Sequence, residues 1–104
     1  MASHRETVDY ICEQMAGAGD IRAKRMFGEY GVYCDDIFIG VICNDTLYVK
    51  PTPQGDAIAD GLDRVPPYQG AKPSIEVPED RLEDHGWLAG LIQATRDALS
   101  TSSR

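Results

Sequence analysis

The sequence predicts a small α+β domain in which one antiparallel sheet is flanked by helices. Two observations support this fold class. Apolar residues recur at helical spacing near both ends of the chain, and three runs rich in β-branched and aromatic residues lie between Val32 and Lys50. Because 104 residues can form one core but not two, we expect a single domain over residues 1–104 with a frayed tail at 100–104.

The first segment is predicted to be a helix. Its apolar stripe follows the spacing i, i+3, i+4, i+7 and consists of Val8, Ile11, Cys12 and Met15. Ser3 followed by Glu6 fits a capping box at the start of this helix. The glycines of the following stretch, Gly17-Ala18-Gly19-Asp20, are expected to end it.

The segment from Val32 to Lys50 is predicted to form an antiparallel meander. Two turn-forming pairs, Asp35-Asp36 and Asn44-Asp45, separate its runs at the length of a hairpin loop. Residues Ile21 to Phe27 are a candidate for a further strand beside the meander.

Two-residue turns would also fix the register of the meander. Tyr33 would then face Phe38, Gly31 would face Gly40, and the paired glycines would leave a shallow dip. One face would carry Tyr33, Phe38, Ile42, Leu47 and Val49, and the other Tyr30, Val32, Ile39, Val41 and Tyr48. Since the second set is too apolar to face water, we expect helices of the chain or a partner subunit to cover it. Phe27, just before the meander, is interpreted as a core or sheet-face residue.

The residues after Lys50 are predicted to add a short helix, an extended segment and a final helix. Thr52 is expected to cap the short helix, with Pro53 at its first position. The extended segment, 73–78, has a proline at each end and is expected at a sheet edge. The final helix has Asp84 as a candidate cap and an apolar stripe made of Trp87, Leu88, Leu91, Ile92, Thr95 and Leu99.

The chain is acidic, with a formal net charge of −7 and a pI of about 4.6. Proteins that bind a phosphate backbone usually carry a basic face, whereas Arg22, Lys24 and Arg25 are three of only ten basic residues here. Direct nucleic-acid binding by this chain alone is therefore not expected. The three residues are interpreted as a solvated edge-strand surface, with a site for an anion or an acidic partner as the alternative.

The sequence contains no recognisable catalytic or cofactor motif. The three cysteines, Cys12, Cys34 and Cys43, have neither disulfide-framework nor zinc-ligand spacing, and a Cys–His pair with His85 has no local motif to support it. We expect a non-enzymatic protein without catalytic residues, metal or cofactor. No apolar run approaches the roughly 20 residues that cross a bilayer, and the N-terminus lacks the apolar core of a secretory signal, so the expected location is the cytoplasm, without membrane contact.

Several short elements resemble, in order and spacing, the N-terminal domain of the TfoX/Sxy family. They are Met26-Phe27-Gly28, Tyr30-Gly31-Val32-Tyr33, Asp45-Thr46-Leu47-Tyr48-Val49-Lys50, and Tyr68 followed by Val77-Pro78-Glu79. The resemblance implies an α+β fold of order α-β-β-β-α-β-β-α, similar in outline to secretion-chaperone-like folds. Full-length members of that family carry a C-terminal helical domain after this one, so a stand-alone N-terminal domain is expected here.

The resemblance also implies a function. TfoX/Sxy proteins are positive regulators of natural-competence genes that act with the cyclic-AMP receptor protein. We therefore expect a small regulator or adaptor that works through protein–protein contacts, with Lys24, Arg25, Lys50 and Lys72 and the exposed sheet edge as candidate contact surface. The alternatives are a chaperone-like dimeric protein-binding module without a transcriptional role, and a direct DNA-binding regulator. Whether the chain forms a homodimer is left open.

Overall fold

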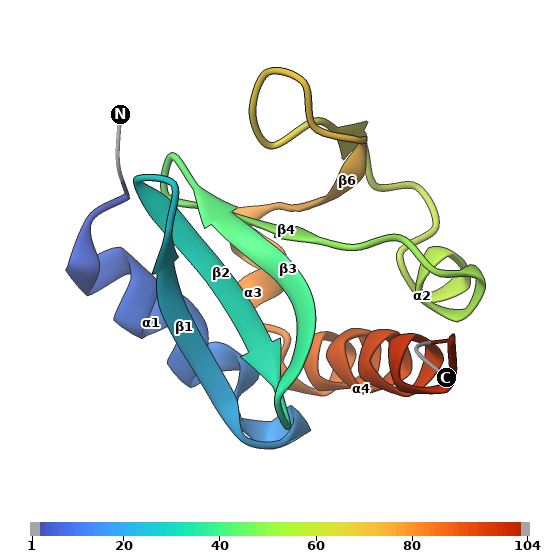
Figure 1. Ribbon diagram of the computed structural model, residues 1–104. Helices are drawn as coiled ribbons and strands as arrows, with labels where there is room; N and C mark the ends of the chain where they lie inside the picture. Colours follow the sequence, from blue (N-terminus) through green and yellow to red (C-terminus); the bar gives the residue numbers. More distant parts are fainter. Residues whose placement is uncertain (1–2, 103–104) are drawn as a thin grey trace.

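The computed structural model describes residues 3–102 and confirms the α+β fold (Figure 1). Its helices and strands follow the predicted succession, and the candidate strand at Ile21 is the first strand of the sheet. The elements are α1 (Arg5–Met15), the 3-10 turn η1 (Ala16–Ala18), β1 (Ile21–Met26), β2 (Glu29–Cys34), β3 (Ile37–Cys43), β4 (Thr46–Val49), α2 (Pro53–Ile58), β5 (Arg64–Val65), β6 (Ser74–Val77), α3 (Glu79–Leu82) and α4 (His85–Ser102).

The strands form one six-stranded antiparallel sheet in the order β1-β2-β3-β4-β6-β5. β1 is therefore an edge strand, as the basic residues around Lys24 suggested. The expectation that 73–78 lies at an edge is wrong, because β6 pairs with both β4 and β5. Its two prolines, Pro73 and Pro78, flank the strand instead of interrupting it, so they remove no donor from its ladder.

The three hairpins that connect β1, β2, β3 and β4 have two-residue turns with both residues at positive φ, the geometry of type I′ turns. Asp35-Asp36 and Asn44-Asp45 form two of them, as predicted, since Asp and Asn tolerate this region better than most residues. The third consists of Phe27, at φ 51°, and Gly28, at φ 82°. A phenylalanine in this conformation is unusual.

A β-bulge in β3 changes the predicted register. Tyr33 pairs with Phe38 as expected, but Val32 pairs with Gly40, so Ile39 is an extra residue in β3. The prediction that Gly31 faces Gly40 is therefore wrong; Gly31 faces Val41. The pairing of β3 with β4 is confirmed, with Gly40 opposite Val49.

The bulge also exchanges residues between the predicted faces. Tyr33 and Phe38 lie on one face, whereas Ile42, Leu47 and Val49 lie on the other, which is buried. Val41 and Tyr48 lie on the same face as Tyr33 and Phe38. The buried face also contains Tyr30, Val32 and Ile39. The sheet thus has one core face and one more open face.

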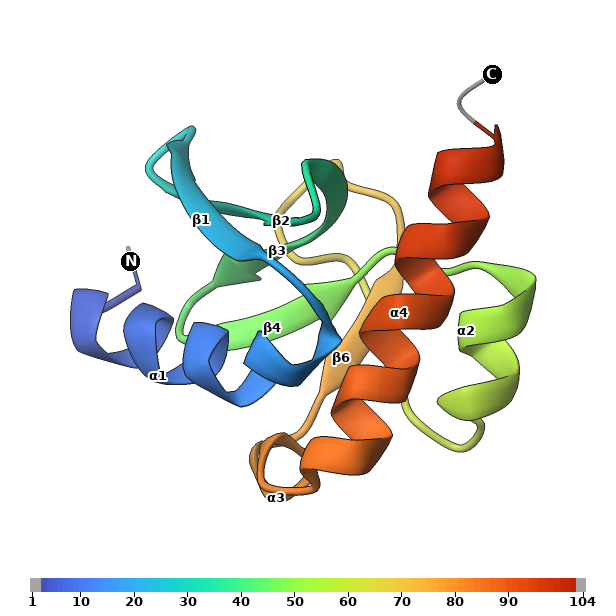
Figure 2. The same cartoon turned by 90° about the horizontal axis from the view of Figure 1, so that it is seen from below.

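The core lies between the sheet and the helices. Figure 2 shows α1, α3 and much of α4 on one side of the sheet, with the β1–β2 hairpin and the loop between β5 and β6 rising on the other side. The largest side chains that are fully buried come from both layers: Ile11, Met15, Ile39, Ile42, Leu47, Ile75, Leu88, Leu91 and Ile92. The core therefore needs the helices on only one face of the sheet.

Two of the three predicted helix caps are present. Thr52 accepts a hydrogen bond from the Gly55 N–H at 3.0 Å, and Asp84 accepts one from the Trp87 N–H at 3.2 Å. The predicted capping box at Ser3 is wrong: α1 has His4 at its N-cap position, and the Ser3 hydroxyl accepts from the Asp45 N–H at 2.9 Å. Ser3 thus ties the start of α1 to the β3–β4 turn.

The frayed tail expected at 100–104 lies partly outside the described residues. Within them, α4 continues through Ser102. Among residues 3–102, no helix combines the length and the apolar character that crossing a bilayer would require.

Candidate functional site

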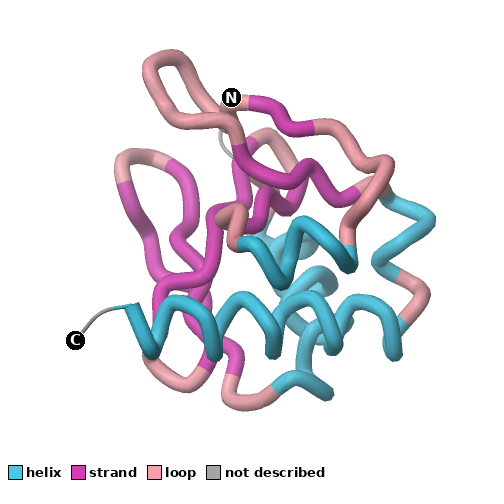
Figure 3. Tube along the Cα trace, turned by 90° about the vertical axis from the view of Figure 1, so that its right-hand side faces the viewer, coloured by secondary structure: helices cyan, strands magenta, loops and turns pink. Residues whose placement is uncertain are grey.

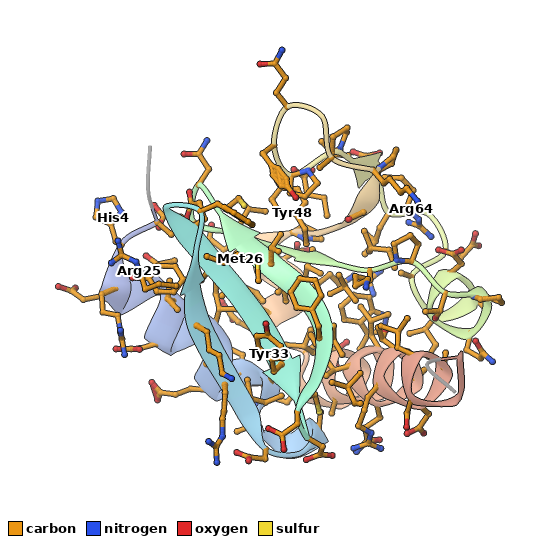
Figure 4. The ribbon with its side chains drawn as sticks, viewed as in Figure 1. His4, Arg25, Met26, Tyr33, Tyr48 and Arg64 are labelled. Carbon is orange, nitrogen blue, oxygen red and sulfur yellow. The ribbon has the colours of Figure 1, made fainter. Side chains whose placement is uncertain are left out.

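The sheet face opposite α1 and α4 is the candidate site and is called the outer face below. Its central row, set by the register, runs Lys24, Gly31, Val41, Tyr48, Glu76. Tyr33 and Phe38 form the next row. Figure 4 shows Met26, Tyr33 and Tyr48 on this side of the sheet. Its side chains include the aromatic rings of Tyr33, Phe38 and Tyr48 beside the cations of Lys24 and Lys50.

An aromatic pair and two lysines form one end of the outer face. The Tyr33 and Phe38 rings lie with centroids 5.3 Å apart, tilted by 46°. The Lys24 Nζ lies 4.9 Å from the Tyr33 ring centroid, and the Lys50 Nζ lies 5.0 Å from that of Phe38. Each lysine therefore makes a cation–π contact, which holds its charge over the face instead of leaving it free in solvent.

Met26 covers the glycine in the middle of the outer face. A Cβ added to Gly31 would lie 2.7 Å from Met26 Cε and 3.2 Å from Phe38 Cε1. The absence of a side chain at Gly31 thus lets the flexible Met26 thioether lie flat against the strand beside Phe38.

Phe27 stands at the tip of the β1–β2 hairpin and is 97% exposed. It combines two costs: a φ of 51°, which costs an L-residue roughly 1–2 kcal/mol, and an aromatic ring left in water. Across the outer face, Tyr68 in the 66–73 loop is 54% exposed. Figure 3 shows this loop and the β1–β2 hairpin, both at the left, projecting away from the helices.

Between the hairpin and the loop the surface is hollowed into what we call the trough. Its most apolar part, 240 Å³, is lined by Met26, Phe27, Glu29, Tyr30, Val41 and Tyr68. A second hollow of 120 Å³ shares Val41 and Tyr68 with the first and reaches Phe38, Lys50 and Lys72. A third of 510 Å³ extends past Phe27 and Tyr68 toward Asn44. All three border Tyr68.

The structure brings three of the four predicted contact residues together. Lys24 and Lys50 lie on the outer face, and Lys72 lines the same hollow as Lys50. They are all the lysines of the chain, and within residues 3–102 none of them takes part in an ion pair. The outer face therefore carries three cations without an ion-pair partner among the described residues, and Glu29 and Glu76 are carboxylates near them.

Arg25 does not belong to this group. It pairs with Tyr30 in the row that faces the helices, and its guanidinium carbon lies 5.5 Å from the Tyr30 ring centroid. Figure 4 places Arg25 beside α1, away from Tyr33 and Tyr48. Neighbouring residues of a strand point to opposite faces, which separates Arg25 from Lys24.

The two carboxylates near the trough are already engaged. Glu29 accepts hydrogen bonds from the backbone N–H groups of Ser3 and Asn44, both at 2.9 Å, and although burial opposes it, these bonds leave the pKa of Glu29 lowered. Glu76 accepts from the Tyr48 hydroxyl at 3.4 Å, and burial together with Glu76 raises the pKa of Tyr48.

A hollow of 720 Å³ lies between the start of α2 and the end of α4 and is lined mainly by proline, alanine and threonine; its carboxylate, Asp97, is 3.0 Å from Arg96. His85, the candidate for a Cys–His pair, contacts the Gln14 side chain through Nε2.

Sequence reasoning missed the two exposed aromatics that flank the trough. The interpretation of Phe27 as a core or sheet-face residue is wrong, and Tyr68 was noted only as part of a motif. A usable signal existed for Phe27: Phe27-Gly28 separates two strands at the same two-residue length as Asp35-Asp36 and Asn44-Asp45.

Comparison with known proteins gives two matches. The family model described as the TfoX N-terminal domain matches residues 13–99, a span that includes every strand of the sheet. An uncharacterized 12.7 kDa protein from the trpE 5′ region of Spirochaeta aurantia is 30% identical over 99 residues, which cover 95% of this chain and 85% of that protein.

Proposed function

This chain belongs to the TfoX N-terminal domain family, and on that premise we propose that it is a small non-enzymatic regulatory or adaptor protein that acts by binding another protein through its outer face. The family supports a TfoX-like regulatory or adaptor role. The direct contact with a protein partner, and the surface that makes it, are the additions proposed here.

One observation carries this proposal: the exposed Phe27 ring beside the trough. Large apolar side chains that are exposed and conformationally strained are costly to a free protein, and they are common as anchors of protein contacts. Lys24, Lys50 and Lys72 add cations around an apolar floor, the combination of anchor and polar rim that protein interfaces use.

The cysteines support a non-enzymatic role. Burial raises the pKa of the Cys12, Cys34 and Cys43 thiols, which lowers the fraction of reactive thiolate. A nucleophilic cysteine has the opposite shift. The Cys34 thiol donates to a backbone acceptor, the Ala18 carbonyl oxygen, at 3.8 Å.

The proposed partner is a transcription factor, with the cyclic-AMP receptor protein as the candidate that the family resemblance suggests. The runner-up is a chaperone-like dimeric module, which the same exposed apolar surface favours. The two differ in their consequence for the cell, because only the first requires that transcript levels depend on the outer face.

Transcript profiling in the native cell tests the proposed function. The chromosomal copy is replaced by a Lys24→Ala/Lys50→Ala/Lys72→Ala variant, and its transcripts are compared with those of a deletion strain. The triple variant should reproduce the changes of the deletion, whereas Arg5→Ala, a matched loss of an exposed cation on α1, should not. A deletion that leaves every transcript unchanged would contradict a regulatory role.

A further inference from the structure

We propose that the trough binds an extended acidic segment of a partner protein, with one apolar side chain of that segment in the hollow between Phe27 and Tyr68 and its carboxylates against Lys24, Lys50 and Lys72. This inference rests on the proposed function, because it specifies the class of partner. It adds the chemical character of the segment that the partner presents.

The size and lining of the first hollow select an apolar side chain. Its 240 Å³ are lined by Met26, Tyr30 and Val41 as well as by the two exposed rings, and Glu29, its acidic residue, accepts hydrogen bonds from backbone donors. An apolar cavity of about 150 Å³ is enough to hold benzene. The hollow therefore has room for one leucine or phenylalanine side chain, which would also bury part of Phe27.

The charges around the trough select an acidic segment. Lys24 and Lys50 lie over the aromatic pair at one end of the outer face, and Lys72 lines the same hollow as Lys50, so the cations lie beside the apolar hollow and not in its lining. A carboxylate that approaches any of them meets a cation without an ion-pair partner among the described residues. Glu29 and Glu76 accept hydrogen bonds within the fold, and neither forms an ion pair with a lysine among the described residues.

The shape of the trough selects an extended segment instead of a folded surface. The hollows of 120, 240 and 510 Å³ adjoin one another at Tyr68 and continue between the hairpin and the loop. A row of neighbouring hollows, one of them mostly apolar, fits a linear peptide with a single anchor residue.

A nucleic-acid strand fits the same surface less well. Single-stranded nucleic acid stacks its bases on open aromatic faces, but Lys24 and Lys50 already cover a face of the Tyr33 and Phe38 rings. Three lysines also release few counterions, on a chain whose net charge is −7.

A second copy of this chain is disfavoured on charge. Packing two outer faces together would bring six lysines into one contact and join two chains of net charge −7. An acidic segment of a different protein meets the lysines without placing further cations beside them.

Peptide selection tests the proposal. Phage that display random twelve-residue peptides are selected on the intact protein, after removal of phage that also bind the Lys24→Ala/Lys50→Ala/Lys72→Ala variant. We expect the enriched peptides to place aspartate or glutamate beside one aromatic or aliphatic residue. A synthetic copy of the most enriched peptide, labelled with fluorescein, then gives affinities by fluorescence anisotropy.

Two substitutions separate the charge from the anchor. The triple lysine variant should bind the labelled peptide about tenfold more weakly, since three exposed ion pairs of roughly 0.5 kcal/mol each sum to about 1.5 kcal/mol. Val41→Asp, which puts a carboxylate in the wall of the hollow, should weaken binding by a similar factor, whereas Arg5→Ala should leave it unchanged. Near-UV circular dichroism of each variant checks that it is folded.

Enrichment of neutral or basic peptides, or of none, would overturn the proposal, and so would tighter binding of a twelve-nucleotide oligothymidine than of the best peptide. These outcomes are distinct from a failure of the proposed function. If transcripts still depend on the three lysines while acidic peptides are not selected, the regulatory role stands and only the acidic class of partner is wrong.

Discussion

The core face and the outer face of the sheet use the same strands but differ in what their side chains contact. On the core face Val32, Ile42 and Val49 are fully buried beneath α1 and α4. On the outer face Tyr33, Phe38 and Val41 remain partly exposed, and lysines are their polar neighbours. A sheet of this size can thus build its core from one face and leave an apolar surface on the other.

The three hairpin turns show the same difference on a smaller scale. Asp35-Asp36 and Asn44-Asp45 place residues that tolerate positive φ at positions that require it, and the side chains of Asp35 and Asp45 form hydrogen bonds within the fold. Phe27 occupies the equivalent position in the β1–β2 turn with no such advantage. Local stability explains the first two turns, and we propose that binding explains the third. Four predictions separate these contributions.

The largest effect is expected from truncation in the core face. Ile42→Ala should lower the free energy of unfolding by about 3 kcal/mol, because it leaves a cavity among fully buried neighbours. Val41→Ala, at the adjacent position on the outer face, should cost about 1 kcal/mol. Urea unfolding of both variants measures the difference, and equal losses would show that the outer face is part of the core.

A second comparison uses the two glycines of the sheet. A Cβ at residue 40 would lie 2.2 Å from the Tyr48 carbonyl oxygen, so Gly40→Ala forces the backbone apart and should cost about 2–3 kcal/mol. At residue 31 the nearest atom is the flexible end of Met26, so Gly31→Ala should cost less than about 1 kcal/mol. The urea midpoints would contradict this account if Gly31→Ala were the more damaging change.

Phe27→Asn should change stability and binding in opposite directions. Asparagine tolerates positive φ, so the free energy of unfolding should rise by about 1 kcal/mol, while the exposed ring is lost and partner binding weakens. Phe27→Tyr keeps both the ring and the backbone conformation, so neither the free energy of unfolding nor partner binding should change. Thermal unfolding and the anisotropy assay measure the two effects. A Phe27→Asn protein that is stabilised yet binds normally would remove Phe27 from the site.

The smallest effect is expected from pH, at the contact between His4 and the β3–β4 turn. The hydrogen bond from His4 Nδ1 to Asp45 Oδ2, at 2.8 Å, raises the pKa of His4 above its usual 6.5. Because the folded pKa is the higher one, the stabilisation is complete below pH 6.5 and is lost as the pH rises through the raised value. Unfolding in urea should therefore need slightly less denaturant at pH 9 than at pH 6.

His4→Gln is the control for this pH effect, because glutamine can bond Asp45 but does not titrate. The difference between pH 6 and pH 9 should shrink in that variant, and binding at the outer face should stay the same. A larger pH dependence in His4→Gln than in the unchanged protein would contradict the assignment to His4.

Much of the fold follows from residue types in the sequence. Asp and Asn pairs mark two hairpins, and Thr52 and Asp84 mark two helix starts, because each supplies chemistry that the local backbone requires. The bulge at Ile39 could not be derived in this way, since no residue type is required at an extra strand position. Gly40, next to it, is a weak indication of a bulge.

The candidate site was predicted in part. Lys24, Lys50 and Lys72 were chosen from the sequence and lie together, but the choice of Arg25 ignored the alternation of side chains along β1. The trough itself depends on how the 66–73 loop lies opposite the β1–β2 hairpin. That arrangement is tertiary, and the residues of the loop alone do not specify it.

The central claim, that partners bind the outer face, is tested most directly by photo-crosslinking in the native cell at two tyrosines. Tyr68 and Tyr10 are similarly exposed, at 54% and 41%, but Tyr68 borders the trough and Tyr10 lies on α1. Each is replaced in turn by p-benzoylphenylalanine, a photoreactive residue of similar shape. The account predicts a discrete crosslinked protein from position 68 that disappears in the triple lysine variant, and none from position 10. Crosslinks from position 10 alone would contradict it.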